Sequence, residues 1–295
     1  MNHLAKIQRA VDYIEQHLDD ELTFDAIARV AGLSRWHFQV IFNATVGDTL
    51  KEYIRKRRLT AAAIAIGMTD ERILDVALQA GFESQEAFTR AFKAMFGRTP
   101  GDCRKQGIKS VMILRKPTIT NTYLNHLYKG ITMKPVIKKI KAMQVAGLGA
   151  RFISATSPDT NNFQVIPKLW ASYQERAGEI KSRVRPADLG VVICLEEKDK
   201  KSHPDEMLYL ACTEVKDASP VPKGMTALTI PAGKYAVFTH KGPIENIGHT
   251  VNYIYGSWLP KSDKQLRDAP HLEIYDERFK PGHSDSQLDV CVPVR

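Results

Sequence analysis

Residues 28–47 read ARVAGLSRWHFQVIFNATVG, and residues 77–97 repeat the pattern as ALQAGFESQEAFTRAFKAMFG. Both stretches share an AxxAG segment, two later phenylalanines and a closing glycine, and the second stretch has one extra residue after its first glycine. Each stretch predicts a short helix, a tight turn at Gly32 or Gly81, where glycine adopts a left-handed conformation without steric cost, and a second helix. The chain is therefore expected to carry two helix-turn-helix units.

One rigid helix is expected between the two units, over residues 48–67, with Asp48 as its N-cap. Such a helix spans roughly 28 Å at about 1.5 Å per residue. Recognition helices that enter adjacent major grooves on one face of DNA lie about 34 Å apart. This spacing favours a monomer that contacts two adjacent major grooves of double-stranded DNA.

A run of basic residues at 55–58 lies on this connecting helix, where the DNA phosphates would pass. Arg55 and Arg57 are the predicted phosphate contacts. A solvated helix face is the alternative interpretation of the run.

The composition sets broader limits. The chain has 295 residues, which predicts two domains, and its net charge of +9 is compatible with a polyanionic partner. The four cysteines lie far apart and lack the CxxC or cysteine–histidine spacing of zinc sites, so neither a metal nor another cofactor is predicted. No apolar stretch is long enough to span a membrane, and the N-terminus does not resemble a signal peptide. We expect a cytoplasmic, nucleoid-associated protein that does not contact membranes.

The second helix of each unit presents an outward face suited to DNA. In the first unit Phe38 and Phe42 form the buried side, while Trp36 and Gln39 are expected to contact a sugar or thymine methyl and a base edge. In the second unit Arg90 lies opposite the buried phenylalanines and is expected to grip guanine or a phosphate. The alternative is that these polar positions contact only solvent.

This part of the chain resembles the DNA-binding domain of the AraC/XylS family of transcriptional regulators, and in particular its MarA/SoxS/Rob branch. The resemblance covers roughly residues 4–106 and rests on WHFQVIFNATVGDTLKEYIRKRRL at 36–59 and ILDVALQAGFESQEAFTRAFKAMFGRTPGDCRK at 73–105. It implies seven helices, with base contacts from the third and the sixth. We expect an activator of transcription that also contacts RNA polymerase.

Two positions depart from that branch. Val40 stands where the branch commonly has an arginine, and Glu86 stands where a glutamine is common. The loss of a cation and the gain of a carboxylate are expected to weaken the attraction to phosphates and to change base preference. With these positions included, the predicted DNA-binding residues are Arg35, Trp36, Gln39, Val40, Arg55, Arg57, Ser84, Gln85, Glu86, Thr89 and Arg90.

The C-terminal part carries a duplication of its own. Residues 189–215 align without gaps on residues 269–295, and each copy predicts a strand, a polar turn and a strand. A further strand and a helix precede each copy. Strand–helix–strand–strand, present twice, predicts an α+β domain with one antiparallel sheet, both helices on one side, and a cleft on the other face.

Within this alignment Glu273 occupies the position of Ile193. A buried acid is costly unless it is paired or protonated, which suggests a role for the carboxylate. We interpret it as the counter-charge for a small cationic, apolar effector that aromatic rings surround. The predicted ligand-binding residues are Glu273, Tyr275, Trp170, Tyr173, Tyr235 and Trp258. A structural carboxylate bonded to Tyr275 or to backbone amides is the alternative.

Three segments resemble the GyrI-like effector-binding domain: IPAGKYAVFTHKGP at 230–243, IYGSWLP at 254–260 and LEIYDERF at 272–279. The resemblance covers roughly residues 133–295 and implies a ligand cleft between the two repeats, with an acidic residue that maps onto Glu273. Two other readings stay open. The domain could be a small-molecule hydrolase that uses Glu273 with Tyr235 or Tyr275, or a protein-interaction module without a ligand.

No activated nucleophile, triad or metal motif is visible, so no catalytic residue is predicted and we expect a protein that is not an enzyme. The expected organisation is multidomain. It comprises an all-α AraC-type double helix-turn-helix domain in residues 1–107, a linker in residues 108–132, and an α+β GyrI-like domain in residues 133–295.

Overall fold

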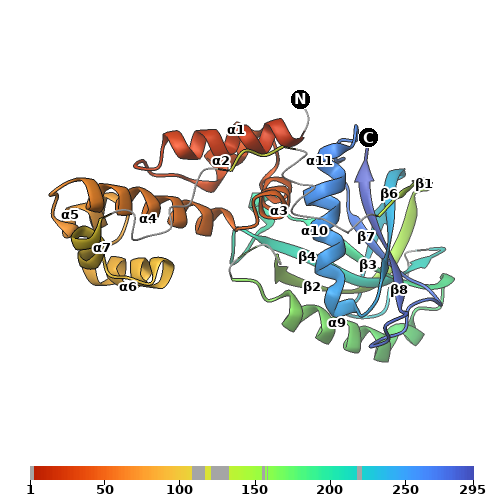
Figure 1. Cartoon of the computed structure of the whole chain (residues 1–295). Helices are drawn as coiled ribbons and strands as arrows, with labels where there is room; N and C mark the ends of the chain where they lie inside the picture. The colour runs from red at the N-terminus through yellow and green to blue at the C-terminus, as the bar shows by residue number, and fades with distance from the viewer. Residues whose placement is uncertain (1–2, 108–116, 121–132, 155–156, 158, 218–220) are drawn as a thin grey trace. The chain divides into compact units, whose positions relative to one another are not determined.

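The computed structural model divides the chain into two compact units, Met1–Leu127 and Tyr128–Arg295 (Figure 1). The structure describes residues 3–107, 117–120, 133–154, 157, 159–217 and 221–295. Most of the predicted linker, at 108–116 and 121–132, lies outside the described residues. The domain boundaries at 107 and 133 therefore stay predictions.

The described part of the first unit is helical, as expected. Its helices are α1 (His3–Gln16), α2 (Phe24–Ala31), α3 (Arg35–Val46), α4 (Leu50–Met68), α5 (Ile73–Gln79), α6 (Gln85–Phe96) and α7 (Pro100–Gln106). The two helix-turn-helix units are α2–α3 and α5–α6, and α4 connects them (Figure 1). The fold class predicted for this domain is confirmed.

Local capping explains where these helices begin and end. The Thr23 hydroxyl accepts a hydrogen bond from the N–H of Ala26 in the first turn of α2, and Gly32 ends that helix at φ 63°. The prediction that Asp48 caps α4 is wrong, because Thr49 is the N-cap. Thr49 and Glu52 form a reciprocal capping box that satisfies two backbone donors, which one aspartate cannot do.

The two units share one packing scheme. Phe88 and Phe92 of α6 are fully buried against a cluster that includes Leu59 and Ile66 of α4. Phe38 and Phe42 are the equivalent buried residues of α3. Because α4 contributes to the core as well as connecting the units, it holds α6 in a fixed orientation within this domain.

The second unit is built on one antiparallel sheet in the order β1-β6-β8-β7-β3-β4-β2-β5. Its strands are β1 (Val136–Ile140), β2 (Met143–Ile153), β3 (Arg183–Cys194), β4 (Glu206–Val215), β5 (Thr226–Ile230), β6 (Gly233–Lys241), β7 (His271–Tyr275) and β8 (Gln287–Val294). Its α-helical and π-helical segments are α9 (Asn162–Arg176), α10 (Ile247–Tyr253), a π-helical turn (Ile254–Trp258) and α11 (Leu259–Lys261).

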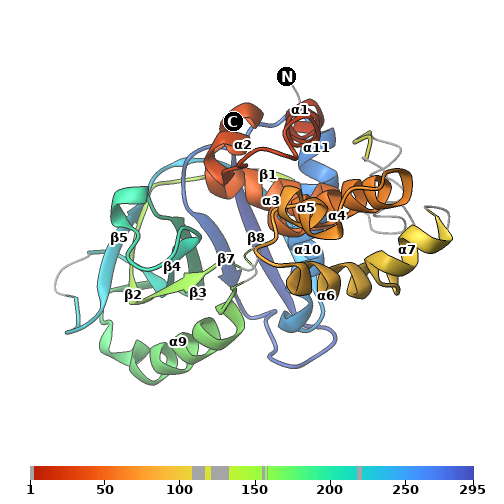
Figure 2. The ribbon, with the colours of Figure 1, turned by 90° about the vertical axis from the view of Figure 1, so that its left-hand side faces the viewer.

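The predicted repeat is present as β2–α9–β3–β4 and β6–α10–β7–β8, and the two copies meet at the β3–β7 pair. Helix α9 packs on β2 and β4, and α10 packs on β6 (Figures 1 and 2). The α+β architecture with two helices on one antiparallel sheet is therefore confirmed.

The sheet is strongly curled. Five strands separate β1 from β2 in the sheet, which would place them about 29 Å apart if the sheet were flat. Only Lys141 and Ala142 connect these strands, a link that spans at most about 11 Å. The connection from β5 to β6 is equally short. One face of the sheet therefore becomes concave.

The ladder register assigns side chains to the two faces, because cross-strand partners share a face and alternate residues return to it. The helix-covered face carries, in turn, Tyr209, Ala211, Gly190, Glu273, Val290 and Phe238. The concave face carries an apolar cluster that includes Leu210, Val191, Leu272, Cys291 and Val237. The sequence analysis predicted a cleft on the face opposite the helices, with Glu273 inside it. This placement of Glu273 is wrong, because Glu273 lies on the helix-covered face.

The register also corrects the repeat alignment. Val191 pairs with Leu210, and a shift of 81 residues carries this pair onto Leu272 and Cys291, which pair in the second copy. The predicted shift of 80 residues is therefore wrong by one, which exchanges the two faces of a strand. Glu273 corresponds to Val192 and not to Ile193, although an aliphatic residue still occupies the equivalent place.

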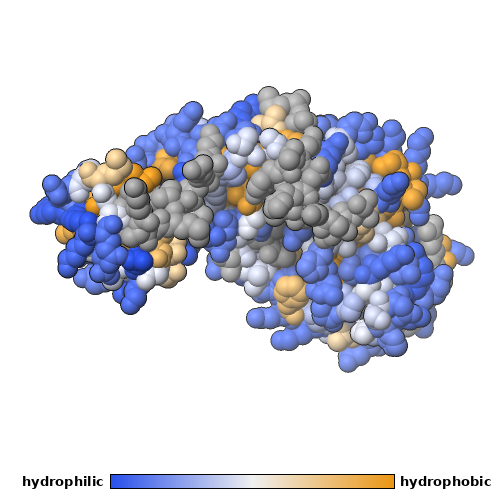
Figure 3. All heavy atoms as spheres, viewed as in Figure 1, coloured by the Kyte–Doolittle hydropathy of each residue, from blue (hydrophilic) through white to orange (hydrophobic). Residues whose placement is uncertain are grey.

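Hydrophilic side chains predominate on the face of the molecule in Figure 3, where hydrophobic ones form scattered patches. Among the described helices, none is both long and apolar enough to cross a membrane. The described residues also contain no group of three or more histidine, cysteine or acidic side chains arranged to hold a metal ion.

Candidate functional site

Helix α6 presents its predicted contact residues to solvent. Gln85, Glu86 and Arg90 are exposed, and Thr89 is partly exposed, whereas the opposite side of the helix is buried. Ser84 has a second task, because its hydroxyl accepts the N–H of Ala87 at 3.1 Å and caps the helix. Arg90 has no hydrogen-bond or ion-pair partner within the described part of the chain. An exposed arginine on the first turns of such a helix is available to a base or a phosphate.

Helix α3 differs. Nη1 of Arg35 forms an ion pair with Oδ1 of Asp25 at 2.7 Å, and its guanidinium lies 4.2 Å from the centre of the Phe24 ring. Trp36 is partly exposed, while Gln39 and Val40 are buried in the structure.

The arginines of the basic run on α4 differ in whether they have partners within the domain. Arg57 is held inside the domain, where its Nε and Nη2 donate to the two carboxylate oxygens of Glu15 at 2.7 and 2.9 Å. Tyr53 donates to the same carboxylate at 2.6 Å. Arg58 donates to the backbone oxygens of residues 18 and 20. Arg55 alone of these three arginines is exposed, and it is the one available to phosphates.

In the second unit Glu273 lies at the centre of a hydrogen-bonded cluster. The hydroxyls of Tyr209 and Tyr275 both donate to Oε2 of Glu273, at 2.6 and 2.8 Å. Nε1 of Trp170 donates to the Tyr209 hydroxyl at 3.1 Å and so fixes the direction of that phenol. Among the described residues no group donates to Oε1 of Glu273. Oε2 therefore accepts two hydrogen bonds, whereas Oε1 accepts none from these residues and can contact a ligand.

Aromatic rings surround this carboxylate. The ring centroids of Trp170 and Tyr275 lie 4.7 Å apart in an edge-on arrangement, and Phe279 packs 4.8 Å from Tyr275. Phe152 packs on Tyr209 at 6.2 Å. We refer to Glu273, Tyr209, Tyr275 and Trp170 as the Glu273 cluster.

Burial raises the pKa of Glu273 above its ordinary value of 4.5, and the hydrogen bonds from Tyr209 and Tyr275 counteract part of that rise. Burial also raises the pKa of both phenols, and the nearby carboxylate adds to the rise. The phenols therefore stay protonated and act as donors. A ligand cation would favour the ionised carboxylate.

Tyr173 and Trp258 make other contacts. Tyr173 packs on Trp170 but is buried, and its hydroxyl donates to Asp188 at 2.8 Å. Trp258 packs on Phe238 at 4.9 Å.

Tyr235 lies on the concave face with Val237, opposite the face of Glu273. Its hydroxyl donates to the backbone oxygen of Pro270 at 3.2 Å. Of the predicted aromatic residues, Tyr275 thus donates to Glu273 directly, and Trp170 acts on it through Tyr209.

Two residues of this site were missed by the sequence analysis. Tyr209 supplies the shorter hydrogen bond to Glu273, and Gly190 leaves room for it. The sequence contained an indication of each. A tyrosine in a buried strand requires a partner for its hydroxyl, and a glycine inside a strand often marks a close approach.

Comparison with known proteins agrees with this architecture. Residues 133–295 match the family described as the GyrI-like small molecule binding domain. The chain belongs to the GyrI-like family. Residues 27–106 match a helix-turn-helix domain family, which covers most of the double helix-turn-helix domain. The expected combination of an AraC-type DNA-binding domain and a GyrI-like domain is confirmed.

Two relatives match the full length of the chain, and a third matches its DNA-binding part. The Right origin-binding protein of Escherichia coli (strain K12) is 27% identical over 301 residues, which cover all of both chains. The Transcriptional regulator Rob of Salmonella typhimurium is 25% identical over 307 residues, again across both full lengths. The Regulatory protein SoxS of Salmonella typhimurium is 40% identical over 104 residues, 35% of this chain and 97% of SoxS. This GyrI-like chain is a DNA-binding transcriptional regulator.

Proposed function

We propose that the chain is a ligand-sensing activator of transcription, in which α6 and α3 contact adjacent major grooves and the Glu273 cluster binds an amphipathic cation. The proposed ligand binding rests on the environment of the Glu273 carboxylate. Two phenol groups donate hydrogen bonds to one of its oxygens, and aromatic rings lie around it. The regulatory relatives favour this reading over a hydrolase.

The exposure of α6 supports the DNA part of the proposal. Gln85 and Arg90 extend from its solvent face, and the pairing of Arg57 with Glu15 leaves Arg55 as the phosphate contact on α4. Phosphate contacts position the protein and provide much of the affinity, while side chains at base edges provide specificity. Arg90 is the proposed base-reading residue of the second unit.

The chemistry of the Glu273 cluster supports a cationic ligand. A cation near Oε1 gains an ion pair in a poorly solvated site, where Coulomb attraction is stronger than in water. The faces of Trp170 and Tyr275 add cation–π contact and accept the apolar part of the ligand. A neutral ligand of the same shape would gain only the apolar part.

Activation requires a contact with the transcription machinery, and we assign this contact to RNA polymerase. We propose Met68 on α4 and Leu78 on α5 as the contact residues, because their apolar side chains are 73% and 53% exposed. Replacement of both by serine is expected to abolish activation while DNA affinity stays within twofold. A loss of DNA affinity instead would contradict this assignment.

We further propose that the protein acts in the cytoplasm on the bacterial nucleoid.

A two-stage experiment tests the proposed function. Sequencing of genomic fragments retained by the purified full chain first identifies its specific sites. Transcription from these sites by purified RNA polymerase is then measured with and without dodecyltrimethylammonium, below its critical micelle concentration. An effector shifts the outcome only if it binds two states with different affinity. We expect transcript yield to change at least twofold in the wild type and not in Glu273→Gln. The absence of specific sites, or an equal response in the variant, would contradict the proposal.

A further inference from the structure

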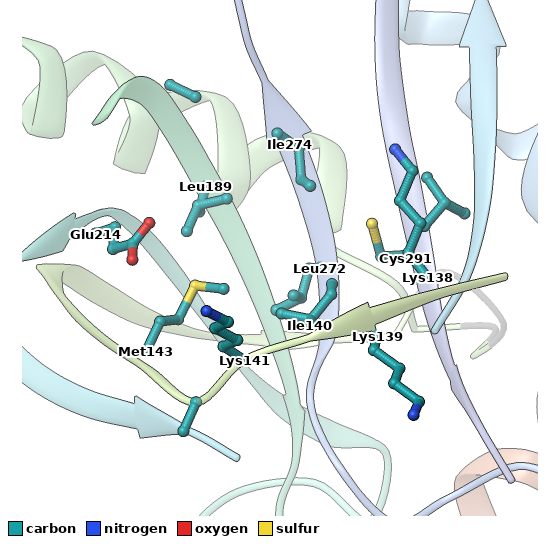
Figure 4. A pocket seen from close by; sticks show the side chains of 13 residues that line it. Lys138, Lys139, Ile140, Lys141, Met143, Leu189, Glu214, Leu272, Ile274 and Cys291 are labelled. Carbon is teal, nitrogen blue, oxygen red and sulfur yellow. The ribbon is translucent and has the colours of Figure 1, made fainter. Parts of the chain in front are cut away.

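A cavity lies on the concave face of the sheet, opposite the Glu273 cluster. Its volume is about 500 Å³, within the roughly 300–1,000 Å³ typical of small-molecule sites. The floor is apolar and comes from four adjacent strands. It comprises Val237 together with Leu189, Leu272, Ile274 and Cys291, which are labelled in Figure 4. The side chains of the floor belong to the buried apolar cluster of this face or pack against it.

The charge at this cavity is opposite to that of Glu273. Lys138, Lys139 and Lys141 line it together with a single acid, Glu214. The three lysines are exposed, and within the described part of the chain they have neither an ion-pair nor a hydrogen-bond partner. Three cations and one carboxylate leave the lining with a net positive charge.

The register separates these lysines. Lys138 pairs with Tyr235 across β1 and β6, which places it on the concave face, while Lys139 pairs with Lys234 on the other face. Figure 4 agrees: Lys138 lies beside Cys291, and Lys139 is directed away from the apolar floor. Burial raises the pKa of the Cys291 thiol to about 12, and the nearby Lys138 counteracts the rise.

Lys141 lies in the short connection that crosses from β1 to β2. Its side chain runs beside Met143 at the edge of the cavity (Figure 4). The curl of the sheet therefore places Lys138 of β1 and Lys141 of the connection over the same apolar floor.

We propose that this cavity binds an amphipathic anion, whose alkyl chain lies on the apolar floor and whose carboxylate or sulfate contacts Lys138 and Lys141. This site is separate from the proposed effector site, because the sheet lies between them and their charges are opposite. The chain would then accept two ligands of opposite charge on the two faces of one sheet.

Calorimetric titration of the full chain with three ligands of equal chain length tests this proposal. The probes are laurate, dodecanol and dodecyltrimethylammonium, each below its aggregation concentration. We expect saturable binding of laurate to the wild type. Across the series from octanoate to laurate, affinity is expected to rise about fourfold per methylene if the chain enters the apolar floor. Binding that does not saturate, or affinity that is independent of chain length, would overturn the proposal.

Matched lysine variants locate the head group. The double variant Lys138→Gln, Lys141→Gln is expected to lower laurate affinity about tenfold or more, because two charge-assisted contacts are lost. Lys139→Gln removes the same charge from the same strand on the other face, and it should change laurate affinity less than twofold. An equal loss in Lys139→Gln would indicate attraction to a charged surface and not a site.

Glu273→Gln separates this proposal from the proposed function. It is expected to leave laurate affinity unchanged, even if the cation site fails its own test. Loss of laurate binding in Glu273→Gln would show one shared site and overturn the second one. The three lysine side chains are exposed, and glutamine preserves the shape of the Glu273 side chain. Retained circular dichroism checks that each variant is folded.

Discussion

Gly190 lies directly opposite Glu273 across the β3–β7 pair, and a Cβ at Gly190 would fall 2.8 Å from Oε2 of Glu273. The same Cβ would fall 2.0 Å from the hydroxyl oxygen of Tyr209. The absence of a side chain at residue 190 is therefore what allows the phenol and the carboxylate to meet over the centre of the sheet. Gly190 does not have a positive φ angle, so the site requires glycine here for space and not for backbone conformation.

Gly190→Ala is expected to displace the Tyr209 phenol, because this ring is rigid and buried and cannot tilt away without leaving Glu273. We expect a loss of stability of roughly 1–3 kcal/mol, as in other overpacked sites, and weaker binding of dodecyltrimethylammonium. Chemical denaturation and calorimetry of the variant measure the two effects. Gly149→Ala is a suitable control, since a Cβ there would meet its nearest neighbour only at 3.4 Å. Equal behaviour of the two variants would contradict the close-contact account.

The raised pKa of Glu273 predicts a pH dependence of cation binding. Protonated Glu273 offers no counter-charge, so affinity for dodecyltrimethylammonium should rise as the pH rises from the ordinary value of 4.5 through the raised pKa, and then level off. Binding should also release protons in this window. Titrations at several pH values in two buffers of different ionisation enthalpy measure both. In Glu273→Gln the pH dependence should disappear, and its persistence would place the titrating group elsewhere.

The same raised pKa has the opposite effect on folding. The folded state binds the Glu273 proton more tightly than the unfolded state, so this residue makes the free energy of unfolding fall as the pH rises through the same window. Glu273→Gln should flatten that part of the stability profile, which urea unfolding at several pH values would show. An unchanged slope in the variant would contradict the assignment.

Arg90→Ala is expected to reduce specific DNA binding more than nonspecific binding, since an exposed arginine at a base edge contributes roughly 1–3 kcal/mol of discrimination. Fluorescence anisotropy with a specific and a scrambled duplex measures the ratio of the two affinities. Lys93→Ala removes a cation from a later turn of the same helix and serves as the control. If the ratio is unchanged in Arg90→Ala, α6 supports the fold and does not read bases.

Arg55 and Arg57 should separate DNA affinity from stability. Arg57→Ala leaves the carboxylate of Glu15 without its bidentate partner in a site where both side chains are mostly buried, so we expect a loss of roughly 1–3 kcal/mol of stability. Arg55→Ala should instead weaken binding to all DNA sequences and reduce the salt dependence of affinity by about one phosphate contact. Thermal unfolding and salt titrations compare the two. The reverse pattern would restore Arg57 as the phosphate contact.

The parts of the fold that depend on local chemistry could be predicted from the sequence. The cap at Thr23, the left-handed glycines and the two helix-turn-helix units require only neighbouring residues. The partners that decide a site are distant in sequence. Glu15 lies 42 residues from Arg57, and no periodicity indicates this pairing.

The sheet shows the same limit. Alternating residues of a strand point to opposite faces of the sheet, which the sequence alone indicates. Only the hydrogen-bonding register shows which residues of neighbouring strands share a face. A shift of one residue placed Glu273 with the wrong partner in the repeat, and Tyr235 was assigned to the ligand although it lies on the opposite face. The partner of the Tyr209 hydroxyl could be identified only once β4 had been placed two strands from β7.

The most direct test of the account is calorimetric titration of wild type and Glu273→Gln with dodecyltrimethylammonium and with dodecanol. The substitution preserves shape and removes only the charge, and an amide oxygen can still accept from Tyr209 and Tyr275. We predict that the variant loses at least about tenfold in affinity for the cation while dodecanol binds as in the wild type. Equal losses for both ligands, or no binding of either ligand by the wild type, would contradict the assignment of Glu273 as the counter-charge of an effector.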